Sequence, residues 1–102
     1  MKFFIVTSLK EYQDDVCKIF KAASIKVFSA TDVIGFKDNQ TNNLLADWFA
    51  SGEQKFDSMF IFSFTTDENA ELGMKLVKNY NTENVSNFPV RAFIVPVEKA
   101  SY

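Results

Sequence analysis

The sequence predicts an α+β fold, and three observations carry this prediction. Short apolar runs of β-forming residues occur four times, two amphipathic helical stretches alternate with them, and one long polar insertion separates the second run from the third. The resulting order β-α-β-β-α-β is the ferredoxin-like arrangement, an antiparallel four-stranded sheet with two helices on one face. With 102 residues, 47% of them hydrophobic, the chain fits a single domain over residues 1–102.

The first strand and the first helix are predicted at the start of the chain. Residues 2–7 form a short apolar run, and Ser8 with Glu11 has the spacing of a capping box, so we expect the helix to begin there. Its apolar face recurs at steps of three and four residues and consists of Leu9, Tyr12, Val16, Ile19, Phe20 and Ala23.

The remaining elements follow from alternation and from capping residues. Residues 26–36 are predicted as the second strand and residues 58–65 as the third, which is apolar on both faces and therefore central. Thr66 or Asp67 caps a second helix that ends near residues 79–81 and buries Ala70, Gly73, Met74 and Val77. Residues 90–97 form the last strand, and Pro96 places it at a sheet edge.

Both faces of the predicted sheet are apolar, yet two helices cover only one of them. Phe3 and Ile5 alternate with Phe4 and Val6 in the first strand, and the third and fourth strands repeat this pattern. An exposed apolar face of that size is unusual in a monomer. We therefore expect a homo-oligomer in which another subunit covers the second face.

Composition limits the classes of partner. A net charge of -2 and a pI near 5.0 argue against nucleic acid and against anionic membranes, because both require concentrated Lys and Arg. No apolar run reaches the length of a membrane span, so we expect no direct membrane insertion and a cytoplasmic protein. Cys17, the single cysteine, falls within a predicted helix and is expected to be a buried apolar residue in a reduced compartment.

Enzymatic activity is not expected, and no catalytic residue is assigned. The chain contains no His, which removes the commonest general base and the commonest metal ligand. Cys17 has no activating base nearby in the sequence. Asp67, Glu68 and Glu71 cluster where a helix begins and are explained by its dipole, so no metal site is predicted.

Four segments resemble the PII signalling family in their order and spacing: Ile5–Lys10, Asp14–Val16, Ala22–Ile25 and Thr31–Lys37. This resemblance implies a trimer of ferredoxin-like subunits whose sheets line the centre. It further implies a small effector, such as an adenine nucleotide or 2-oxoglutarate, bound in clefts between subunits. A long loop after the second strand, here residues 37–55, would dock on an enzyme or a membrane transporter.

The candidate effector-site residues are loop positions that the resemblance matches, with Asn39 or Gln40 standing loosely for the family's ligand-contacting Gln, and the two remaining plausible cations, Lys55 and Arg91. Gly35 and Phe36 match the opening of the loop motif, but Lys37 replaces the next glycine, and the family's modified Tyr has no counterpart. The turn before the last strand, residues 81–89, lacks the glycines and basic residues that cradle phosphates. The identity of the effector or cofactor therefore cannot be predicted, and the candidate ligand-binding residues are Gly35, Phe36, Lys37, Asn39, Gln40, Lys55 and Arg91.

The insertion also carries an apolar group. Leu44, Leu45, Trp48 and Phe49 are spaced to share one side of a short helix. One interpretation is packing against the sheet or a neighbouring subunit. The other is a partner-binding surface, because Trp and Phe dominate interface energetics when they enter a pocket.

Two further interpretations remain beside the regulatory one. The same element order serves the RNA-recognition motif, in which aromatic residues of the first and third strands stack on bases, and Phe4, Phe60, Phe62 and Phe64 offer such rings. The acidic pI, the missing basic-Gly-Phe motif and the expected aliphatic character of both sheet faces argue against it. The other alternative is a protein-interaction or oligomerisation domain.

Overall fold

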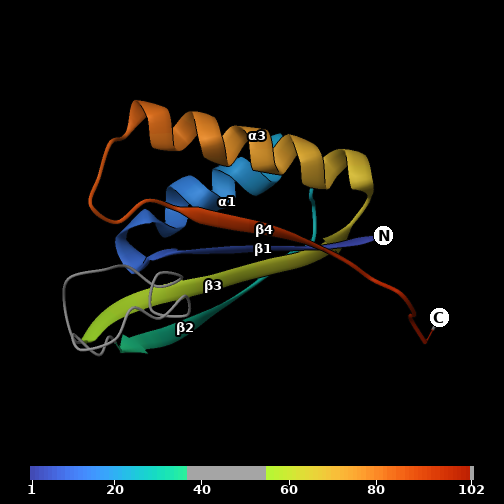
Figure 1. Ribbon diagram of the computed structural model, residues 1–102, viewed down its shortest axis with the longest axis horizontal. Helices are drawn as coiled ribbons and strands as arrows, with labels where there is room; N and C mark the ends of the chain where they lie inside the picture. The colour runs from blue at the N-terminus through green and yellow to red at the C-terminus, as the bar shows by residue number, and fades with distance from the viewer. Residues whose placement is uncertain (37–54, 102) are drawn as a thin grey trace.

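The computed structural model describes residues 1–36 and 55–101, and in this part of the chain it has the predicted element order (Figure 1). The α+β prediction is confirmed, because residues 1–36 and 55–101 form four antiparallel strands in one sheet and two α-helices. The elements are β1 (Lys2–Leu9), the 3-10 helix η1 (Lys10–Tyr12), α1 (Gln13–Ala22), β2 (Ser29–Phe36), β3 (Lys55–Thr65), α3 (Asp67–Glu83) and β4 (Arg91–Pro96).

The strand order is β2-β3-β1-β4, as in a ferredoxin-like sheet. β1 is central because it pairs with both β3 and β4, and Ile5 lies opposite Phe62 on one side and opposite Phe93 on the other. β3 is the second central strand, as predicted. β4 is an edge strand, which confirms the prediction from Pro96, a residue without an N–H to donate.

The hydrophobic core lies between one sheet face and the two helices, which Figure 1 shows on the same side of the sheet. Phe4 and Val6 of β1 and Ile61 of β3 are fully buried at its centre. The other buried members of this core are Val16, Ile19, Phe20, Ala23, Ile25, Met59, Ala70, Val77 and Val90. The predicted stripe of α3 is confirmed at Ala70, Gly73 and Val77, while Met74 is half-buried.

The predicted capping box is wrong. Ser8 and Leu9 belong to β1, where they pair with Met59 and Ser58, so the first helix begins later, through η1. The Ser8 hydroxyl donates to the Leu9 carbonyl, 3.0 Å away, and no side chain caps η1 or α1. Leu9 therefore does not belong to the apolar face of the helix.

Other boundaries differ by a few residues. β2 begins at Ser29 rather than at residue 26, and β3 begins at Lys55, which had been assigned to the insertion. α3 continues to Glu83, beyond the predicted end, and its predicted cap is confirmed, because the Asn69 N–H donates to Thr66 Oγ1 over 3.2 Å. Cys17 is only partly buried, so the expectation of a buried cysteine is wrong.

Candidate functional site

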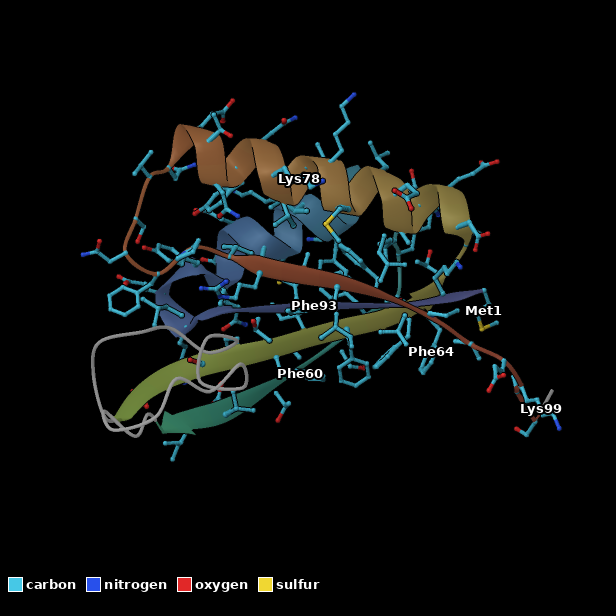
Figure 2. The ribbon with its side chains drawn as sticks, viewed as in Figure 1. Met1, Phe60, Phe64, Lys78, Phe93 and Lys99 are labelled. Atoms are coloured by element: carbon cyan, nitrogen blue, oxygen red, sulfur yellow. The ribbon has the colours of Figure 1, made fainter. Side chains whose placement is uncertain are left out.

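The sheet face opposite the helices carries a group of phenylalanines, and we call it the open face. The pairing register assigns its residues, because side chains alternate between the two faces of each strand. Among the described side chains, its apolar residues are Phe3, Ile5 and Leu9 of β1, Val33 of β2, Phe60, Phe62 and Phe64 of β3, and Phe93 and Val95 of β4. In Figure 2, Phe60, Phe64 and Phe93 lie along the sheet, away from Lys78 of α3.

The phenylalanines of the open face contact one another. Phe3 stacks on Phe64 with ring centroids 4.7 Å apart and meets Phe62 edge-on at 5.7 Å. Phe60 and Phe62, two residues apart on β3, lie at 5.4 Å. Such offset and edge-on pairs are favourable beyond the area they bury. These four rings, from β1 and β3, therefore form one continuous aromatic cluster.

This surface remains partly accessible in a single chain. Phe64 is 58% exposed and Val95 is 42% exposed, whereas Phe3, Phe60, Phe62 and Phe93 are half-buried. The expectation of an apolar second face is confirmed, but its expected aliphatic character is wrong, because five of its side chains are phenylalanines. Aromatic side chains of this kind are suited to docking another apolar surface.

The candidate ligand-binding residues of the described chain fall into two separate groups. Phe36 and Lys55 are paired residues at the last step of the β2–β3 ladder, and Gly35 pairs with Phe56 beside them. Arg91 begins β4, at the opposite edge of the sheet, and pairs with Thr7. Neighbouring strands lie about 4.8 Å apart, so three strand spacings, about 14 Å, separate the two edges. One subunit does not bring Arg91 to the group at Gly35.

The other candidate residues lie outside the described residues. These are the ligand candidates Lys37, Asn39 and Gln40 and the apolar group Leu44, Leu45, Trp48 and Phe49. Their assignment to an effector site and to a partner-binding loop stays a prediction.

A second surface feature, not predicted from the sequence, lies between α1 and α3. A groove of about 550 Å³ is lined by residues of both helices, among them Asp15, Lys18, Tyr80 and Glu83. The Tyr80 hydroxyl donates to Asp15 Oδ2 over 2.6 Å across this groove. Burial, followed by the hydrogen bond to Asp15, raises the pKa of Tyr80 to about 12. No spacing rule in the sequence links these two residues, because 65 positions separate them.

Within residues 1–36 and 55–101 no cluster of three His, Cys, Asp or Glu side chains is placed to hold a metal ion. In the same residues, neither helix combines the length and the apolar character that crossing a bilayer requires.

Comparison with known proteins supports the fold. No family model matches the chain, and no curated protein matches it. Among solved structures, the crystal structure of a DUF3240 family protein from Shewanella baltica OS155 is similar, with a TM-score of 0.58 and 16% identity over 99% of this chain and 93% of that one. At this identity the similarity shows the fold alone, and the resemblance to the PII family stays a prediction.

Proposed function

We propose that this chain is a non-enzymatic, cytoplasmic regulatory subunit of the PII type that self-associates through its open face, as a trimer. In this proposal the subunits bind a small effector at their junctions, and residues 37–55 dock on a transporter or an enzyme. The observation that carries it is the open face itself, where Phe3, Phe60, Phe62, Phe64 and Phe93 gather on the side of the sheet opposite the two described helices, α1 and α3.

Energetics favour covering this face with a second copy. Full burial of a Phe side chain stabilises by about 1.5–3 kcal/mol relative to exposure. Covering several half-buried rings together therefore gains more free energy than association costs, provided that the two surfaces fit. The net charge of -2 is small, so copies repel one another weakly.

The position of the candidate ligand residues supports a junction site. Gly35 and Phe36 lie on the edge strand β2 with Lys55 beside them on β3, and Arg91 lies on the opposite edge strand, β4. A site that uses both groups must take them from two subunits. This requirement agrees with the clefts between subunits that the PII resemblance implies.

Self-association is tested by the molar mass in solution. We expect wild-type protein at micromolar concentration to give a multiple of the chain mass in light scattering, and Phe64→Ser to shift it towards the monomer. Leu72→Ser is the matched control, because Leu72 is also an exposed apolar residue, at 40%, but lies on α3. A monomeric wild type contradicts the proposal.

Effector binding is tested separately by thermal unfolding. The ligands are adenine nucleotides, cyclic nucleotides, 2-oxoglutarate, bicarbonate and divalent metal ions, since a ligand that binds the folded state raises the melting temperature. We expect one class to give a saturable rise that Arg91→Ala and Lys55→Ala reduce. A flat response to all of them removes the effector from the proposal and leaves the docking role of residues 37–55.

The docking role of residues 37–55 rests on the resemblance and on the apolar group around Trp48. We expect Trp48→Ala to fold and self-associate as the wild type does and to lose capture of the transporter or enzyme. A lower melting temperature or a lost oligomer would instead assign Trp48 to packing.

RNA binding is the second candidate, and one observation favours it. Phe3, Phe60, Phe62 and Phe64 lie on the two central strands of the open face, where stacking rings are found in RNA-recognition motifs. Phe4, also considered for this role, lies on the helix side and is fully buried, so it cannot stack on a base. Salt-sensitive binding of a labelled single-stranded RNA, measured by fluorescence anisotropy, would favour this function, and absence of binding at low salt excludes it.

A further inference from the structure

On the three strands β3, β1 and β4, the described part of the open face carries three polar residues beside its phenylalanines, and we call them the polar island: Thr7, Ser58 and Arg91. Thr7 lies opposite Arg91 on one side and opposite Phe60 on the other, and Ser58 pairs with Leu9, two residues further along β1. All three therefore belong to the face that carries Phe60. Thr7 and Ser58 are each 1% exposed.

Two polar atoms of the island are buried without a hydrogen-bond partner: Ser58 Oγ and Arg91 Nε. The other buried serines of the described chain are paired, since Ser8 donates to the Leu9 carbonyl and Ser63 donates to the Val27 carbonyl. Neither of the two ion pairs found within residues 1–36 and 55–101 includes Arg91. A buried donor without a partner destabilises the protein, so an acceptor placed here would be bound favourably.

We infer that the polar island binds an oxyanion, a carboxylate or a phosphate, which accepts hydrogen bonds from Arg91 Nε and from the Ser58 hydroxyl. The guanidinium group remains charged and presents planar N–H donors that match a carboxylate or a phosphate. The serine hydroxyl adds a neutral donor from β3, on the other side of β1.

Two sources can supply this oxyanion. One is a small anion from solution, which binds whether or not the protein self-associates. The other is a carboxylate of a second copy packed on the open face, and this source rests on the self-association proposed above. In the second case the polar island fixes the register of the two copies, a role attested for single buried polar residues in other interfaces.

The first arm of the test is thermal unfolding in increasing inorganic phosphate, with sodium chloride of equal ionic strength as the reference. If the anion comes from solution, phosphate stabilises the wild type in a saturable way. Arg91→Gln and Ser58→Ala then weaken phosphate binding by about tenfold or more, because each removes a hydrogen bond to a charged group. Ser63→Ala is the matched control, since Ser63 is a buried β3 serine outside the open face.

The second arm is sedimentation equilibrium of the same variants. If the second copy supplies the carboxylate, phosphate has no specific effect, and Arg91→Gln and Ser58→Ala each weaken self-association by about tenfold or more. Arg91→Lys keeps the charge but loses the planar donors, so we expect its phosphate binding and its self-association to lie between those of the wild type and those of Arg91→Gln. It replaces Arg91→Gln in both arms if Arg91→Gln fails to fold.

The outcomes separate the two proposals. A wild type that stays monomeric contradicts the proposed function. The phosphate arm then still tests whether the polar island binds an oxyanion from solution. The inference is overturned if Arg91→Gln, Arg91→Lys and Ser58→Ala, all folded by near-ultraviolet circular dichroism, match the wild type in both phosphate response and self-association.

Discussion

At the scale of single residues, Gly73 determines how closely α3 approaches the sheet. A Cβ atom at this position would lie 2.8 Å from two ring carbons of Phe4, inside normal contact distance. Phe4 is fully buried and packs on Phe20 with ring centroids 5.3 Å apart, so its ring has no free space to move into. A glycine costs about 1 kcal/mol in a helix interior, and the close contact explains why it is present.

We expect Gly73→Ala to destabilise the protein by about 1–3 kcal/mol, because overpacking outweighs the gain in helix propensity. Urea unfolding measures the difference. Combining it with Phe4→Leu, which trims the opposing ring, should recover part of the loss, and the coupling follows from a double-mutant cycle. If Gly73→Ala is as stable as the wild type or more so, α3 is free to move outward and the close packing is not required.

At the scale of elements, α1 and α3 are joined by a polar contact between two residues that line the groove between them. Tyr80 of α3 donates to Asp15 of α1, and its ring meets Tyr12 edge-on with centroids 6.4 Å apart. Deprotonated Tyr80 would lose its donor and face the Asp15 carboxylate. Burial is the largest cause of the raised pKa of Tyr80, and the hydrogen bond to Asp15 and the charge of Asp15 raise this pKa further.

The pH dependence follows from the sign of this shift. The pKa of Tyr80 rises from 10.0 to about 12 on folding, so its contribution to stability is fully present below pH 10 and is lost as the pH rises to about 12. We expect Tyr80→Phe to remove this part of the alkaline loss of stability and Asp15→Asn to reduce it. Denaturant unfolding at several pH values from 9 to 12 measures the effect, and parallel curves for wild type and Tyr80→Phe would contradict it.

The elements themselves were largely predictable from local patterns. Alternation and capping residues correctly predicted four strands and two helices, including the Thr66 cap and the edge position of the strand with Pro96. The first helix start was not predictable from local spacing. Ser8 and Leu9 extend β1 because β3 offers them the partners Met59 and Ser58, and this tertiary pairing overrides a local capping signal.

At the scale of the whole molecule, the sequence predicted that a second sheet face would be apolar but not which residues form it. That assignment depends on the register, which places Phe3 and Phe62 on the open face and Phe4 inside the core. The separation of Arg91 from Lys55 depends on strand order, and the buried donors of Ser58 and Arg91 depend on packing. None of these follows from spacing along the chain.

The two-layer arrangement leaves β2 with less support than the other strands. Among the described elements, the helices pack mainly on β1, on β4 and on each other, while β2 pairs only with β3 (Figure 1). On its helix side Ala30, Asp32 and Ile34 are exposed, Ile34 by 53%, and a surface ion pair of 3.1 Å joins Asp32 to Lys10. Such an edge has few buried apolar contacts to resist local opening.

We therefore expect the β2 amides that donate to β3 to exchange with deuterium faster than the amides that β1 donates to β3, in measurements by NMR at neutral pH. Lys10→Ala should accelerate the exchange of β2 only slightly, because exposed ion pairs contribute little and are screened by salt. Because β1 is covered on one face by both helices and paired on both edges, it opens only when the whole domain unfolds. Equal protection of the β2 and β1 amides would contradict this prediction and would show that something further packs on β2. If that extra protection of β2 is lost on dilution, a second copy of the chain is its source.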